Sequence, residues 1–193
     1  MKINTSNITG VVLAGGKSSR MKTDKALIKY QNITLLEHQI NLLKTVFDKV
    51  IISANTQEYS FTGTAIINDD EKSKGPIGGI LSALKNTETE YIFILSVDMP
   101  FINKDLIQEL IKDVSTYDIA IPVYNGKYEP TCAVYSKKCI SIIETQIRSK
   151  NNKLIDFINI CNAKFIDINS NSELYSDKIF TNLNTPEELK ALQ

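Results

Sequence analysis

The sequence predicts an α/β fold of three αβα layers, in which helices cover both faces of a mostly parallel sheet. Apolar runs of strand length alternate along the chain with helical patterns, which is typical of βαβ units. The runs at 11–14, 50–52 and 91–95 are apolar at consecutive positions. Consecutive apolar residues indicate strands that are covered on both faces, because a strand with one solvated face would alternate.

Each element has its own local signal. The expected strands are TGVVLA (9–14), KVIISA (49–54), TAII (64–67), YIFILSVD (91–98) and DIAIPV (118–123). The expected helices are TLLEHQINLLKTVF (34–47), GGILSALKNT (78–87) and KDLIQELIKDV (104–114). The segment 149–176 is rich in Asn, Ser and Lys and is expected to hold variable loops.

Helix starts are marked by capping residues. Thr34 with Glu37 forms a T-x-x-E capping box, and Asn103 can cap the helix 104–114. A second box, Thr185 with Glu188, has Pro186 at the first helical position and predicts a C-terminal helix.

Length and composition limit the class of protein. A chain of 193 residues suits one domain, which we expect to span 1–193. Lys plus Arg equals Asp plus Glu at 22 each, so neither nucleic acid nor an anionic membrane is expected as a partner. No leader-like or membrane-length apolar run is present, and the three cysteines lack CxxC spacing. These features favour a cytoplasmic protein without disulfides.

The stretch LAGGKSSRMKTDKA, 13–26, follows the first strand and combines two glycines with a concentration of positive charge. It is not a Walker A loop, because Val11 stands where the first glycine is needed. It is not a G-x-G-x-x-G fingerprint either, because Lys17 follows Gly15 by two positions. A plain turn with solvated lysines is the competing interpretation.

Two observations favour a phosphate or nucleotide site. Arg20 is one of two arginines in the chain, and its planar fork suits phosphate. Five of the eight glycines lie at 15–16 and 75–79, at two strand-to-helix junctions. In a parallel sheet both junctions would face the crevice at the carboxyl ends of the strands, where ligands bind.

Asp98 ends the strand 91–98 and would face the same crevice, where one carboxylate together with substrate phosphates suits Mg²⁺. Helix capping by Asp98 is the alternative, although Asn103 is better spaced for it. Asp69 and Asp70 follow the strand 64–67, so one of them could also face the site. His38, the single histidine, falls inside a helix, which excludes catalytic triads and His-ligated metals.

Four ordered motifs resemble the signatures of molybdenum cofactor guanylyltransferases, the MobA-like nucleotidyltransferases. They are LAGGKSSRMKTDKAL (13–27), GPIGGI (75–80), VDMPF (97–101) and FTNLNTPEEL (180–189). The resemblance covers the whole chain. It implies a Rossmann-like nucleotidyltransferase fold and an enzyme that couples GTP to molybdopterin (Mo-molybdopterin) with Mg²⁺, releasing pyrophosphate. Transient contact with proteins that deliver molybdopterin or mature molybdoenzymes is a further expectation.

The resemblance also implies roles for individual residues. Arg20, Lys25 and Asp98 would be catalytic, with Asp98 holding the metal. The implied nucleotide-binding residues are Leu13, Ala14, Gly15, Gly16, Lys25, Asn55, Asp69, Gly75, Pro76, Gly79 and Asp98. The implied molybdopterin-binding residues are Lys153, Asn182 and Asn184, although Asn184 could instead help to cap the helix that begins at Thr185.

The chain departs from the family pattern in three places. Lys22 stands where a glycine usually follows R-M, and Gly79 stands where alanine is common. Near 150 some members use an arginine for the pterin, and Lys153 is the equivalent in RSKNNKLIDF, without an arginine's bidentate geometry. Two rival functions stay open: a cytidylyltransferase acting on molybdopterin or on a sugar or polyol phosphate, and a non-catalytic nucleotide-binding maturation factor.

Overall fold

The computed structural model describes residues 5–15, 24–68, 74–112, 114–183 and 188. Its main sheet has the strand order β10-β7-β9-β6-β1-β4-β5, and β8 pairs with β7. The strands are β1 (Ile8–Leu13), β4 (Lys49–Ser53), β5 (Ala65–Ile67), β6 (Tyr91–Ser96), β7 (Ile119–Tyr124), β8 (Lys127–Tyr128), β9 (Cys132–Ser136) and β10 (Ala163–Ile168). A small hairpin of β2 (Lys29–Tyr30) and β3 (Ile33–Thr34) lies beside this sheet.

The sheet is mostly parallel, as the sequence predicts. β1 lies between β6 and β4 and is parallel to both, and β5 continues the parallel half beyond β4. β9 is antiparallel to β6 and to β7 on either side of it. The carboxyl ends of β1, β4, β5 and β6 therefore meet at one edge of the sheet.

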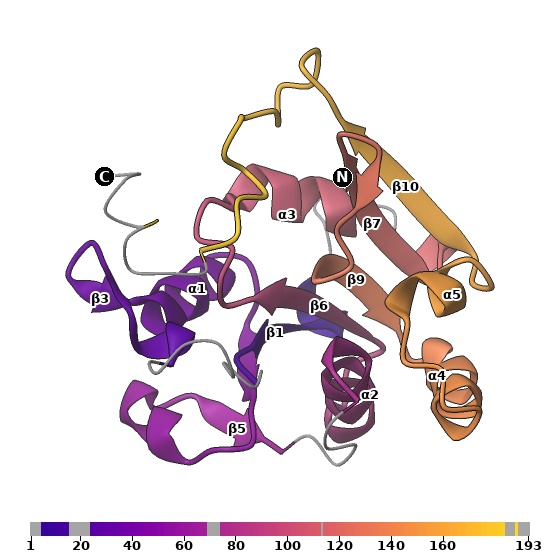
Figure 1. Cartoon of the computed structure of the whole chain (residues 1–193), viewed down its shortest axis with the longest axis horizontal. Coiled ribbons are helices and arrows are strands. Elements are labelled where there is room, and N and C mark those ends of the chain that lie inside the picture. The colour runs from indigo at the N-terminus through magenta and orange to yellow at the C-terminus, as the bar shows by residue number, and fades with distance from the viewer. Residues whose placement is uncertain (1–4, 16–23, 69–73, 113, 184–187, 189–193) are drawn as a thin grey trace.

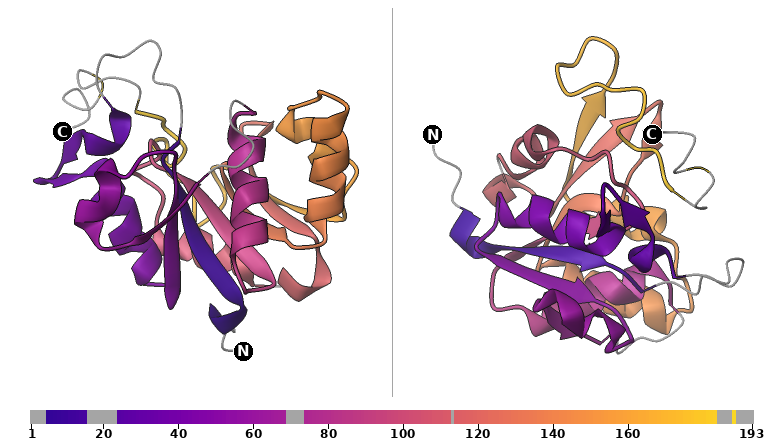
Figure 2. Two further views of the ribbon diagram at one scale, coloured as in Figure 1. Left: turned by 90° about the horizontal axis from the view of Figure 1, so that it is seen from below. Right: turned by 90° about the vertical axis from the view of Figure 1, so that its left-hand side faces the viewer.

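Helices cover both faces of the sheet (Figures 1 and 2). The helices are α1 (Leu35–Lys44), α2 (Pro76–Asn86), α3 (Lys104–Ile111), α4 (Cys139–Arg148) and α5 (Leu154–Ile158). Residues of α1 and α3 pack with Val12 and Phe93 in one buried cluster, whereas α2, α4 and α5 pack with Val11 and Ile92 in another. Adjacent residues of one strand thus enter opposite cores, which explains the consecutive apolar pattern.

Local signals place the helix starts correctly. Thr34 accepts a hydrogen bond from the amide of Glu37 at 3.1 Å, and the Glu37 carboxylate accepts one from the amide of Thr34 at 2.8 Å. The hydrogen bonds that the amide and the hydroxyl of Thr34 donate to this carboxylate hold the pKa of Glu37 below its ordinary value. Asn103 caps α3 by accepting from the amide of Leu106. The second capping box, Thr185 with Glu188, falls partly outside the described residues.

The segment 149–176, which is expected to hold variable loops, also contains regular elements. This segment contains α5 and β10, and β10 pairs in parallel with β7 at the edge of the sheet. The pattern did not reveal β10, because it is an edge strand in which two of the six residues are exposed and three are half-buried, with Lys164 and Asp167 among them. The strand β9 and the helix α4 were also absent from the expected elements.

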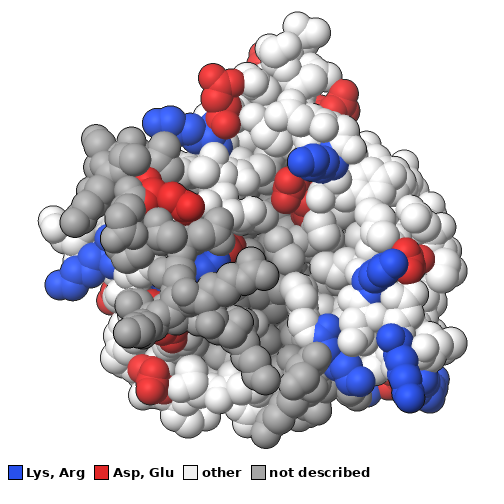
Figure 3. Space-filling model, viewed as in Figure 1, with Lys and Arg blue, Asp and Glu red and all other residues white. Residues whose placement is uncertain are grey.

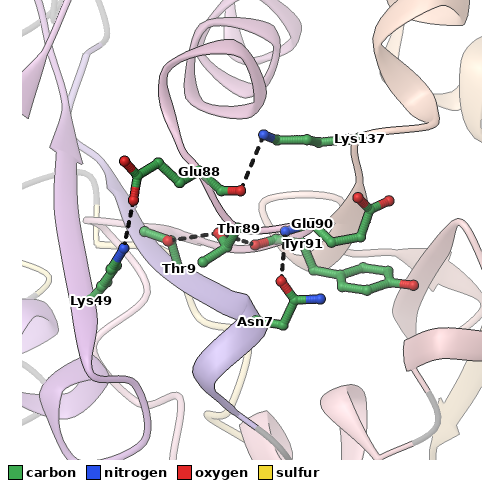
Figure 4. A network of polar contacts seen from close by, with 8 residues as sticks. All are labelled: Asn7, Thr9, Lys49, Glu88, Thr89, Glu90, Tyr91 and Lys137. Atoms are coloured by element: carbon green, nitrogen blue, oxygen red, sulfur yellow. Dashed lines mark hydrogen bonds and ion pairs between the residues drawn. The ribbon is translucent and has the colours of Figure 1, made fainter.

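Polar groups contact one another at the amino-terminal ends of the parallel strands (Figure 4). The hydroxyls of Thr9 and Thr89 lie 2.8 Å apart, and the hydroxyl of Thr89 also donates to the carbonyl of Tyr91. At the rim, Lys49 pairs with Glu88 at 2.9 Å. Hydrogen-bonding groups at this edge are therefore engaged with one another, at the opposite end of the strands from the crevice.

Surface charge follows the balanced composition. On the face shown in Figure 3, basic and acidic side chains of the described residues are interspersed over the surface. None of the helices among the described residues is long and apolar enough to cross a membrane.

Candidate active site

A cavity of about 260 Å³ opens at the carboxyl ends of β1, β4 and β6. Its floor contains the last residue of each of these strands, Leu13, Ser53 and Ser96. The described residues that line it are Leu13, Ala14, Gly15, Asp24, Lys25, Ser53, Ala54, Gly75, Pro76, Gly79, Ser96, Val97, Asp98 and Thr131. They come from segments far apart in the sequence, which the parallel strands bring to one edge.

The structure brings together most of the described residues predicted for the site. Both glycine segments reach this cavity, one through Gly15 after β1 and the other through Gly75 and Gly79 at the start of α2. Lys25 and Asp98 also line it. The complete set is Leu13, Ala14, Gly15, Lys25, Gly75, Pro76, Gly79 and Asp98.

Other predicted residues do not line the cavity. Asn55 is exposed and directly follows the lining residue Ala54. Asn182 is exposed as well, but the amide of its neighbour Leu183 donates to the carbonyl of Asp98 at 2.8 Å. Lys153 precedes α5, where its carbonyl accepts from Gln146 at 2.7 Å. The predicted residues Gly16, Arg20, Asp69 and Asn184 lie outside the described residues.

Lys25 and Asp98 form an ion pair inside the cavity. The Nζ atom of Lys25 lies 3.3 Å from Oδ2 of Asp98, and the two side chains are 23% and 20% exposed. The hydroxyl of Ser96 donates to the other carboxylate oxygen, Oδ1, at 2.6 Å. Both oxygens of Asp98 are therefore held by donors, one of them a cation. The helix-capping alternative for Asp98 is wrong, because Asn103 caps α3.

Asp24 and Tyr59 connect the two ends of the glycine loop. Tyr59 lies in the short helix η3 (Glu58–Thr62), and its ring is buried. Its hydroxyl lies 2.6 Å from Oδ2 of Asp24 and 3.3 Å from the carbonyl oxygen of Ala14. Oδ1 of Asp24 accepts from the amide of Ala26. Burial and the Asp24 carboxylate both raise the pKa of Tyr59, so its hydroxyl keeps its proton and donates.

The amino terminus of α2 opens into the same cavity. Gly75 has φ of +72°, a conformation that favours glycine, and Pro76 takes the first helical position. Among the described residues no side chain caps this helix. The first backbone amides of a helix carry partial positive charge and attract phosphate. The cavity thus combines a helix amino terminus with the ammonium group of Lys25.

A divalent cation fits the chemistry of this cavity. Mg²⁺ prefers oxygen ligands and commonly uses one or two carboxylates together with phosphates and water. Asp98 supplies such a carboxylate, with Oδ2 paired to the side chain of Lys25, whereas the oxygens of Asp24 accept from the backbone amide of Ala26 and from the buried Tyr59. No group of three or more His, Cys, Asp or Glu residues gathers around a common point in the described part of the chain. Substrate phosphates would have to complete the coordination.

Sequence reasoning missed several lining residues. Asp24 stands inside the quoted motif, and Ser53 and Ser96 lie within two residues of the ends of the expected strands 49–54 and 91–98, so the rule that ligands bind at carboxyl ends could have found them. Thr131 precedes β9, whose existence the pattern did not reveal. Tyr59 follows no motif, and only its contacts identify it.

Known proteins similar to this chain include nucleotidyltransferases. The model of a family described as the MobA-like NTP transferase domain matches residues 10–160. A protein of Syntrophotalea carbinolica named molybdenum cofactor guanylyltransferase is 33% identical over 186 residues, which are 94% of this chain and 89% of that protein.

Two further similarities extend over nearly the whole chain. A protein of Carboxydothermus hydrogenoformans, named "Probable molybdenum cofactor guanylyltransferase", is 32% identical over 187 residues, covering 96% of this chain and 95% of that one. The crystal structure of molybdopterin-guanine dinucleotide biosynthesis protein A from Archaeoglobus fulgidus has a TM-score of 0.80 at 22% identity, with 95% of each chain covered. At that identity the second similarity shows the fold.

Proposed function

Because this chain belongs to the MobA-like NTP transferase family, it is a nucleotidyltransferase, and we propose that it transfers GMP from GTP to molybdopterin. The products are the guanine dinucleotide form of the molybdenum cofactor and pyrophosphate. The names of the relatives from Syntrophotalea and Carboxydothermus support this choice of substrates. The observation that carries the proposal is the Lys25–Asp98 pair, which lies in one cavity with both glycine segments.

The chain offers groups for each part of a nucleoside triphosphate. We assign the backbone of Leu13, Ala14 and Gly15 to the nucleoside side, because these residues end and follow β1 and line the cavity. The amino terminus of α2 and the ammonium of Lys25 are placed to attract phosphate oxygens. Arg20 belongs to this proposal through the family motif, as do Gly16, Asn55 and Asp69.

The ammonium of Lys25 has two anionic partners in this proposal, Asp98 and the phosphates of the nucleotide. Its ammonium contacts Asp98 in the structure, and a triphosphate would offer it stronger anionic partners. Asp98 would hold a divalent cation through Oδ2 once Lys25 pairs with the phosphates. Such a cation would supply positive charge that stabilises the reacting phosphates and the pyrophosphate leaving group.

The reaction needs no strong general base from the protein. The attacking group is a terminal phosphate of molybdopterin, which is already anionic at neutral pH. His38 lies on α1, and its Nε2 contacts the carbonyl of Pro100 at 3.0 Å, so it is engaged in the fold. The residues of the site act by orienting two anions and stabilising the leaving group. Lys153, Asn182 and Asn184 are proposed for the molybdopterin side.

The decisive experiment measures pyrophosphate release from each of the four ribonucleoside triphosphates with molybdopterin and Mg²⁺ present. We expect turnover with GTP and loss of at least about a hundredfold in Asp98→Asn, which keeps the shape of the side chain and removes its charge. Circular dichroism and thermal unfolding check that the variant is folded. Turnover with CTP in place of GTP would establish the cytidylyltransferase instead, and GTP binding without pyrophosphate release would indicate a maturation factor.

A further inference from the structure

Gln39 is a fully buried polar residue beneath the turn that carries Asp98. It lies on α1 with 0% of its surface exposed. Its Nε2 atom is 2.7 Å from the carbonyl oxygen of Met99 and 3.5 Å from that of Ser96. These two carbonyls stand on either side of Asp98 in the chain. The side-chain amide of Gln39 therefore contacts the backbone on both sides of Asp98.

The other end of the same amide is unsatisfied. Oε1 of Gln39 is buried and has no hydrogen-bond partner among the described residues. The orientation is determined by chemistry, because both neighbouring carbonyls are acceptors and only the nitrogen can donate to them. A buried acceptor without a partner destabilises the folded state, whereas an apolar side chain of similar volume would fill the space without that penalty. Packing alone does not explain a glutamine at this position.

The residue before Gln39 acts on the same turn. His38 Nε2 lies 3.0 Å from the carbonyl oxygen of Pro100, and since a carbonyl accepts, this nitrogen carries the hydrogen. Neighbouring side chains of α1 thus bind carbonyls at Ser96, Met99 and Pro100. The capping box at Thr34 and the buried face of the helix hold α1 itself in place.

We infer that Gln39 is a positioning residue that fixes the direction in which Asp98 projects its carboxylate into the cavity. The inference rests on the proposed function, since it assigns Gln39 to the carboxylate of that site. Ser96 and Asp98 are joined by the 2.6 Å hydrogen bond, so a rotation of the turn would displace both. Small displacements of a group that holds reacting phosphates reduce the rate sharply, even when substrate still binds.

The test compares two glutamines in matched surroundings. Gln146 is 7% exposed and its Nε2 also donates to a backbone carbonyl at 2.7 Å, that of Lys153, between α4 and α5. Gln39→Met and Gln146→Met each remove one buried amide and keep an unbranched side chain. Because Lys153 is proposed for the molybdopterin side, the control is read on the nucleotide side alone: we expect Gln146→Met to lower the melting temperature and to keep KM for GTP and the affinity for Mn²⁺. The melting temperature should fall less in Gln39→Met than in Gln146→Met, because Gln39→Met also removes the unsatisfied oxygen.

Turnover and Mn²⁺ affinity should show the reverse order, with the larger loss in Gln39→Met. In Gln39→Met we expect kcat to fall about tenfold or more, with KM for GTP within about threefold of the parent value. The affinity for Mn²⁺, measured by electron paramagnetic resonance with a non-hydrolysable GTP analogue, should fall several-fold. Unchanged kcat and unchanged Mn²⁺ affinity in Gln39→Met would overturn the inference and leave Gln39 as a packing residue.

The Mn²⁺ measurement keeps the two proposals apart. If the parent protein releases no pyrophosphate from any nucleotide, the proposed function fails, and Mn²⁺ binding alone decides the role of Gln39. Weaker binding in Gln39→Met than in the parent then supports the inference. Equal binding, or no Mn²⁺ binding by the parent, contradicts it.

Discussion

The hydroxyl of Tyr59 lies 2.6 Å from the carboxylate of Asp24 and 3.3 Å from the carbonyl oxygen of Ala14. Ala14 precedes the glycine loop and Asp24 follows it, so one buried phenol contacts both ends of that loop. Tyr59 comes from η3, a segment outside every motif recognised in the sequence. The loop ends are therefore held in place by a residue that makes no contribution to the lining of the cavity described here.

Removing this hydroxyl should weaken nucleotide binding more than it weakens the fold. In Tyr59→Phe the ring keeps its packing, and we expect the free energy of unfolding to fall by about 1–2 kcal/mol for a lost hydrogen bond to a carboxylate. KM for GTP should rise about five- to tenfold, because binding must now order the loop ends. Steady-state kinetics and thermal unfolding measure the two effects.

Tyr175→Phe is the matched control for Tyr59→Phe. The hydroxyl of Tyr175 also donates to a carboxylate at 2.6 Å, that of Asp177, on a surface segment. We expect KM for GTP to be unchanged in this control. An equal rise in KM in both variants would argue that Tyr59 has no particular relation to the loop.

Lys25 should matter for turnover and little for stability. Its pair with Asp98 is partly solvated, and such pairs contribute about 0–1 kcal/mol. In Lys25→Met we expect kcat/KM for GTP to fall about a hundredfold or more, with a melting temperature within a few degrees of the parent. Lys29→Met, which removes an exposed lysine nearby, should retain activity. A collapse of the melting temperature in Lys25→Met would show that Lys25 is structural.

Gly79 should tolerate alanine and reject larger side chains. A Cβ atom built there would lie 3.1 Å from Leu13 Cδ2 and 3.2 Å from Ser53 Oγ. Both are side-chain atoms that can shift by a few tenths of an ångström, so Gly79→Ala should fold and keep most activity. The branched side chain of Gly79→Val would extend into the cavity, and we expect KM for GTP to rise at least about tenfold. Equal KM values in the two variants would place the nucleotide away from Gly79.

Glu129 should make stability depend on pH. Burial raises its pKa above the ordinary value of 4.5, and Lys127 opposes this only in part. The folded state therefore holds the proton more tightly than the unfolded state, so its contribution to stability is present below pH 4.5 and is lost as the pH rises through the folded pKa.

Glu129→Gln removes that loss, and its melting temperature at pH 7 should exceed that of the parent. The advantage should shrink as the pH is lowered towards 4.5. Glu173→Gln removes the same charge from an exposed position and is the control. Thermal unfolding measured between pH 4 and pH 8 makes the comparison. A variant no more stable than Glu173→Gln at pH 7 would contradict the role of burial.

Strand and helix patterns identified the parallel half of the fold because their signals are local. Buried strands with consecutive apolar residues, a T-x-x-E capping box and Asn103 at a helix start depend on neighbours within a few positions. The antiparallel β9 and the edge strand β10 were missed, since their pairing depends on segments far away in the chain. Single-domain organisation and the roles of the site residues stay predictions.

By itself the sequence determined which chemical groups gather at the carboxyl ends of the strands. Glycines that follow strands, a lysine and a strand-end aspartate are expected to meet there wherever parallel strands share an edge. Only the tertiary structure decided what holds these groups in place. Tyr59 bonds to Asp24, Gln39 to the backbone of the Asp98 turn, and the amide of Leu183 to the Asp98 carbonyl, and each of these hydrogen bonds joins remote segments. The periodicity of the sequence does not reveal such a hydrogen bond, because its two partners come together only when the layers pack.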